Sequence, residues 1–169
     1  MLSIFSFIFS VQLRAEIKSE TVSYKDGDTT LKGYIAFDAA SDKRRPVVFI
    51  VHEWKGLDDY ARSRARQLAE KGYLAMAVDI YGDGMQLKTN EEAGKMAGSY
   101  KKDSKKLRGR MNAAYRYLKS NPLFDSKRVA AIGYCFGGTT VLEWARSGAN
   151  AKGVISFHGG LGSPMPAKR

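Results

Sequence analysis

The residue best suited to nucleophilic catalysis in this chain is its single cysteine, Cys135, which lies at the centre of the stretch Gly-Tyr-Cys-Phe-Gly, residues 133–137. A β-branched and alanine-rich run before it (residues 128–132) predicts a strand, and residues 139–146 predict a helix. A nucleophile between two such glycines, at a turn from strand to helix, is typical of a nucleophile elbow, where the glycines avoid collisions between strand and helix. The helix dipole would favour the thiolate. We predict a catalytic Cys135, although a free cysteine is also often inert core.

A second turn supplies the other group that such chemistry needs. In an elbow the backbone N–H of the following residue, here Phe136, forms half of an oxyanion hole, and the second donor comes from the turn after the third strand. That turn is predicted at residues 51–56, after the apolar run of residues 47–51. Because both turns lie at the carboxyl ends of neighbouring parallel strands, we expect Glu53 and Trp54 to face the elbow.

The elements that position these turns follow an α/β pattern. Apolar runs bounded by turn residues predict strands buried on both faces, and they alternate with segments of helical periodicity. One helix is expected at residues 58–71, with Asp58 as its N-cap and Gly72 after its end. We therefore predict one α/β domain, residues 20–169, with a mostly parallel sheet. The predicted strands are residues 21–24 and 30–37, which form a hairpin, then residues 47–51, 73–78, 128–132 and 153–157.

Charge is concentrated in one predicted helix. The chain has 169 residues and a formal net charge of +11. Residues 101–119 hold eight basic side chains and one acid, Asp103, while four apolar residues recur at helical spacing. We expect the basic side chains to lie on solvent-exposed faces of this helix; the alternative is an anionic partner. The apolar residues are Leu107, Met111, Ala114 and Leu118, and the basic residues are Lys101, Lys102, Lys105, Lys106, Arg108, Arg110, Arg116 and Lys119.

The first residues are interpreted separately from the domain. Residues 2–13 form an apolar, uncharged segment. This segment is too short to span a membrane, and it has the length of the apolar region of a signal peptide. We predict a signal peptide over residues 1–15, with cleavage after Ala15 and export of the protein, and no stable membrane span. The alternatives are a misassigned start or an apolar N-terminal arm on a cytoplasmic protein.

Three motifs together resemble the dienelactone hydrolase family of α/β-hydrolases. They are FIVHEWKGL (residues 49–57), GYLAMAVDIYG (residues 72–82) and IGYCFGG (residues 132–138), in the family's order and spacing, and the resemblance covers roughly residues 21–166. It implies a three-layer fold and hydrolysis of lactones or esters through an acyl-enzyme, without a cofactor. It also implies that Cys135 is the nucleophile, that Glu53 contacts the resting thiol, and that the N–H groups of Phe136 and Trp54 stabilise the oxyanion.

The chain departs from this pattern after the elbow. In α/β-hydrolases an acid and then a histidine follow the nucleophile. After Cys135 the only acidic residue is Glu143, inside the predicted helix, and the only histidine is His158, at the end of the last predicted strand. We expect His158 and Tyr134 to form pocket wall. We also expect the last strands and helix of the fold to be missing, which would leave the final strand as an open apolar edge. The chain is then expected to be part of a longer hydrolase and to have negligible catalytic turnover by itself.

Other functions leave weaker signals. A non-catalytic binding module would use the basic helix of residues 101–119, and a metal site could use His52, Glu53 and Cys135, which lack close ligand spacing. The glycine motifs that bind nucleotides are missing from the sequence, and we expect no nucleic-acid partner. The predicted substrate is a generic small ester or lactone, because the loop after Tyr81 offers Asp83 where an acidic substrate would need arginine. Asp79 and Tyr81 are expected to organise this loop.

Overall fold

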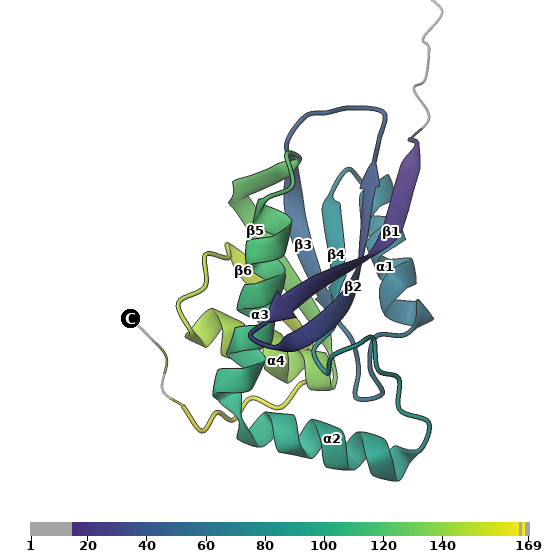
Figure 1. Ribbon diagram of the computed structural model, residues 1–169. Helices are drawn as coiled ribbons and strands as arrows, with labels where there is room; N and C mark the ends of the chain where they lie inside the picture. Colours follow the sequence, from purple (N-terminus) through teal and green to yellow (C-terminus); the bar gives the residue numbers. More distant parts are fainter. Residues whose placement is uncertain (1–14, 166, 168–169) are drawn as a thin grey trace, which may run out of the picture.

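A six-stranded sheet forms the centre of the computed structural model, which describes residues 15–165 and 167 (Figure 1). The strand order is β1-β2-β4-β3-β5-β6. The predicted signal peptide lies outside the described residues, apart from Ala15. The strands are β1 (Ile17–Asp26), β2 (Thr29–Asp38), β3 (Arg45–Val51), β4 (Leu74–Val78), β5 (Phe124–Tyr134) and β6 (Gly153–Phe157), and the helices are α1 (Asp59–Glu70), α2 (Asn90–Lys102), α3 (Ser104–Lys119) and α4 (Phe136–Arg146).

Strand direction follows the predicted α/β pattern. β1 and β2 form the expected hairpin, in which Val22 pairs with Gly33, and β2 pairs antiparallel with β4. The pairs β3–β4, β3–β5 and β5–β6 are all parallel. Every residue of β4 is buried, as expected for a strand covered on both faces. The prediction of an α/β fold with a mostly parallel sheet is confirmed.

Helices cover both faces of the sheet and give three layers (Figure 1). α1 packs its alanines on one face, against Ala36, Ile50, Ala75 and Ala77. α3 and α4 cover the other face, and α2 packs against these two helices. All three contribute to the larger core cluster, which includes Phe49, Met111, Phe136 and Trp144. Asp58 caps α1 by accepting a hydrogen bond from the Ala61 N–H, as predicted. None of the helices in the described part of the chain is long and apolar enough to cross a bilayer.

The basic segment is only partly a solvent-exposed helix face. The four apolar residues that set its helical spacing are fully buried, as predicted. Arg108 and Arg110 are also buried, contrary to the expectation, because each forms an ion pair: Arg108 with Glu143 at 2.8 Å and Arg110 with Asp26 at 2.9 Å. A break at Asp103 places Lys101 and Lys102 on α2. The surface for an anionic partner is therefore smaller than the sequence predicts.

β6 is the outer strand of the described sheet, next to β5. Ile155 is 54% exposed and Phe157 is 46% exposed. Both belong to the alternate residues of β6 that are exposed, whereas Val154 packs against the larger core cluster. The predicted open, apolar final strand is thus present within the described residues.

Candidate active site

Cys135 occupies a strained turn between β5 and α4. Its φ of 52° and ψ of −110° lie in a region that side chains rarely adopt. Its N–H donates a hydrogen bond to the Phe157 carbonyl at 2.9 Å, which ties the turn to β6. α4 begins directly afterwards at Phe136, three residues before the predicted start. The thiol is partly exposed and lies at the N-terminus of this helix, as the elbow interpretation requires.

Two glycines of the elbow are required by close backbone contacts. A Cβ atom at Gly133 would overlap the carbonyl group of Gly137, and a Cβ atom at Gly137 would overlap the carbonyl oxygens of Val51 and His52. The second contact packs the start of α4 directly against the end of β3. The elbow and the turn after β3 are therefore neighbours, which is the arrangement predicted for the two halves of an oxyanion hole.

The two predicted oxyanion donors have no acceptor among the described residues. Within the described part of the chain, neither the Trp54 N–H nor the Phe136 N–H donates to a backbone or side-chain acceptor. The carbonyls of the β3 turn, by contrast, are bonded. Tyr81 Oη donates to the Trp54 carbonyl at 2.8 Å, and the Leu87 N–H donates to the Lys55 carbonyl at 2.8 Å. These bonds hold the turn in one conformation.

His52 is buried beneath this turn. Its Nδ1–H donates to the Glu53 carbonyl at 2.6 Å, and its Nε2 accepts from the Ile80 N–H at 3.3 Å. Burial lowers the pKa of His52, although the bond to the Glu53 carbonyl and the carboxylates of Asp79 and Asp58 act in the opposite direction. His52 is therefore a neutral imidazole with its proton on Nδ1.

Acidification is expected to destabilise the protein through His52. Its pKa is lower in the folded protein than in the unfolded chain, so the unfolded state takes up a proton first as the pH falls below about 6.5. Stability should be lost from pH 6.5 towards pH 5, with a slope of up to about 1.4 kcal/mol per pH unit. Urea unfolding of the wild type and of His52→Asn checks this. An equal slope in both proteins would contradict it.

Asp79 and Tyr81 organise the loop after β4, as expected. The buried Asp79 carboxylate accepts hydrogen bonds from the N–H groups of Lys32, Gly82 and Gly84. Burial raises the pKa of Tyr81, and nearby Tyr100 and Cys135 raise it further. Tyr81 therefore stays a neutral hydrogen-bond donor close to the thiol.

The remaining predicted site residues lie around the elbow and are more exposed to solvent than the buried His52. Glu53 is exposed, and its carboxylate has no hydrogen bond to Cys135, so its contact with the resting thiol stays a prediction. His158 follows β6 with a φ of 45° and is exposed. Tyr134 stacks on Phe157 at 5.0 Å between ring centroids, and it packs with the α1 cluster rather than with Phe136.

The three residues considered as metal ligands do not converge. Both ring nitrogens of His52 are bonded to backbone groups, and Glu53 is exposed. Among the described residues, no group of three or more His, Cys, Asp or Glu side chains could hold a metal ion. The sequence pattern does not indicate that His52 lies next to the predicted oxyanion donor. The only signal is that this histidine directly follows a buried strand.

Comparisons with known proteins agree with this geometry. The sequence profile described as "Dienelactone hydrolase family" matches residues 31–168. A solved structure titled m3DLH is 39% identical, with a TM-score of 0.85, over 89% of this chain and 62% of its own. A dienelactone hydrolase-like promiscuous phosphotriesterase from metagenomic libraries is 38% identical, with a TM-score of 0.83, over 88% of this chain and 62% of its own.

A curated relative adds a named activity. The carboxymethylenebutenolidase of Pseudomonas putida is 27% identical over 69% of this chain and 51% of its own length. The present chain thus spans between about half and three fifths of the length of these three relatives.

Proposed function

This chain belongs to the dienelactone hydrolase family, and on that premise we propose that Cys135 is the nucleophile of a hydrolase acting on carboxylic ester or lactone bonds. The observation that carries the proposal is the strained elbow, which presents a partly exposed thiol at a helix N-terminus beside two unbonded backbone N–H groups. A thiolate and an oxyanion hole are the two requirements for acyl transfer.

The proposed reaction begins with attack of the Cys135 thiolate on the substrate carbonyl carbon. The carbonyl π electrons move to oxygen, and the resulting oxyanion accepts hydrogen bonds from the N–H groups of Phe136 and Trp54. Collapse of this intermediate re-forms the carbonyl and breaks the bond to the alkoxy oxygen. The alkoxide takes a proton from solvent water and leaves as the alcohol, or becomes a tethered hydroxyl when the substrate is a lactone. The product is a thioester on Cys135.

Release of the acyl group requires an activated water. His52 is committed to backbone hydrogen bonds and His158 is exposed beyond β6, so the described residues offer no positioned base. We propose that this chain is acylated by activated esters and then releases the acyl group very slowly. The complete catalytic cycle would need a histidine outside the described site.

Acylation is tested with p-nitrophenyl acetate and intact-mass spectrometry. The expected result is one acetyl group per chain, located on Cys135 by peptide mapping, with p-nitrophenol released in a single burst. Protein pretreated with iodoacetamide is the matched control and should give no burst, since its thiol is alkylated. Acetylation confined to lysines, or sustained turnover in the pretreated protein, would contradict the proposal.

A further inference from the structure

We propose that His52 is a positioning residue that fixes the oxyanion donor of the β3 turn. The inference rests on the proposed function and concerns how one of its two N–H donors is held. His52 does not touch the thiol in this arrangement; it acts through the peptide bond that joins Glu53 to Trp54.

The argument begins with the geometry of that peptide. The Glu53 carbonyl and the Trp54 N–H belong to the same planar group, and in a trans peptide they point in opposite directions. The described chain contains no cis peptide bond. His52 Nδ1–H binds the Glu53 carbonyl at 2.6 Å, so this bond also fixes the direction of the Trp54 N–H. A bonded carbonyl further polarises the N–H of the same peptide, which strengthens it as a donor.

His52 is itself held rigidly. Its side chain is almost completely buried, its ring stacks on Phe136 at 5.9 Å between centroids, and Tyr81 packs edge-on at 5.0 Å. The Ile80 N–H donates to Nε2 at 3.3 Å, which requires Nε2 to be unprotonated and leaves the proton on Nδ1. The loop after β4 therefore selects the tautomer that donates to the turn.

An additional bond to the Glu53 carbonyl is weaker. The Gly56 N–H also donates to it, at 3.4 Å, which is close to the limit for a hydrogen bond. Because the His52 bond is much shorter, we expect it to decide the orientation of the peptide.

Two amide substitutions separate the roles of the ring nitrogens. The side-chain amide of His52→Asn lies near the position of Nδ1 and can still donate to the Glu53 carbonyl. The amide of His52→Gln lies near the position of Nε2 and cannot. Loss of one oxyanion donor lowers the rate of acyl transfer about 100-fold to 1,000-fold. We expect a decrease of about 100-fold in the acylation rate for His52→Gln and of less than about 10-fold for His52→Asn.

Alkylation by iodoacetamide is the matched control, because it consumes the same thiolate without forming an oxyanion. Both variants should be alkylated at the wild-type rate, while only His52→Gln is acylated slowly. Equal acylation rates in the two variants would overturn the inference, and so would a parallel loss of acylation and alkylation. A wild type that is alkylated but never acylated would overturn the proposed function and this inference with it.

A second measurement uses the wild type alone and does not depend on how the variants fold. Nitrogen-15 NMR of the His52 ring should show a protonated Nδ1 and an unprotonated Nε2 between pH 6 and pH 8. The opposite tautomer would overturn the inference, because Nδ1 could then not donate to the Glu53 carbonyl.

Discussion

Replacing Cys135 by alanine is expected to lower the rate of acylation by p-nitrophenyl acetate by about 10⁴-fold or more, to the level of the uncatalysed background. The thiol is the only nucleophile that the elbow presents next to the unbonded N–H groups of Phe136 and Trp54. The measurement is the burst of p-nitrophenol at equal protein concentrations. A burst that persists in the variant would mean that another residue is acylated.

Cys135→Ser is the informative control for this substitution. A hydroxyl group needs a general base at neutral pH, whereas thiols are intrinsically much stronger nucleophiles than hydroxyl groups. Since the described residues place no base at the elbow, the serine variant should be as unreactive as the alanine variant. Substantial acylation of the serine variant would reveal a base near residue 135.

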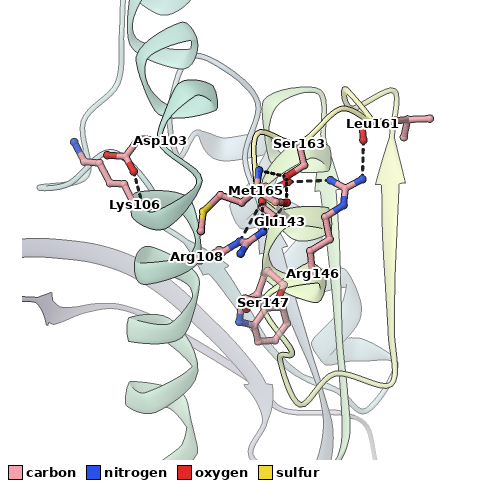
Figure 2. A network of polar contacts seen from close by, with 10 residues as sticks. Asp103, Lys106, Arg108, Glu143, Arg146, Ser147, Leu161, Ser163 and Met165 are labelled. Atoms are coloured by element: carbon pink, nitrogen blue, oxygen red, sulfur yellow. Dashed lines mark hydrogen bonds and ion pairs between the residues drawn. The ribbon is translucent and has the colours of Figure 1, made fainter. Parts of the chain in front are cut away.

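Removing the Glu143 carboxylate is expected to produce the largest loss of stability, about 3–5 kcal/mol in the free energy of unfolding. Glu143 is 1% exposed and accepts hydrogen bonds from Arg108 at 2.8 Å and Arg146 at 2.9 Å. Figure 2 shows how α3 and α4 contribute these side chains to one network. In Glu143→Gln the buried Arg108 would lose its counter-charge, which is the costly situation for a buried ion pair.

The ionisation of Glu143 agrees with this role. Burial alone would raise the pKa of Glu143, but hydrogen bonds from Ser163, Arg108 and Arg146 lower it below its ordinary value. Urea unfolding at pH 7 measures the loss in Glu143→Gln. The double variant Glu143→Leu/Arg108→Met is the control, and it should recover more than half of the loss because no buried charge is left unpaired at this position. An equally unstable double variant would show that packing, not charge, is responsible.

The same network orders the segment after β6. Arg146 donates to the Leu161 carbonyl at 2.6 Å, and Arg108 donates to the Met165 carbonyl at 3.5 Å (Figure 2). The Gly160 N–H donates to Thr139 Oγ1 at 2.9 Å, so the segment passes over the first half of α4. A loss of the Glu143 pair should therefore loosen this segment first.

The sheet and the elbow were predictable because their signals are local. Runs such as residues 47–51 and 153–157 have the composition of buried or edge strands, and the glycines around Cys135 mark a turn. The start of α4 was missed because glycine is a poor helix former. Gly137 and Gly138 are helical nevertheless. Glycine is required at both positions because contacts with Val51, His52 and Gly159 leave no room for a side chain.

Features that depend on distant partners were not predictable from the pattern. Arg108 and Arg110 were expected on an exposed face, but their partners Glu143 and Asp26 are 35 and 84 residues away in the sequence. The role of His52 depends on Ile80, Tyr81 and Phe136 in the same way. A periodicity argument identifies which face of an element is apolar, and it cannot identify a buried charge that has a remote counter-charge.

The pairing of β3 with β5 also bears on how the protein is made. Val47 pairs with Val129, so the two strands that carry the halves of the site are separated by roughly 80 residues of chain. Closing a loop of this length is slow, because its entropic cost is offset only when the contacts of the whole strand pair form. During synthesis the β3 turn leaves the ribosome long before Cys135, and the thiol leaves before β6, whose Phe157 holds the elbow. A nascent chain that already contains Cys135 but not Phe157 therefore carries a thiol whose turn lacks this bond, and the proposed reactivity towards esters is expected only once β6 has joined the sheet.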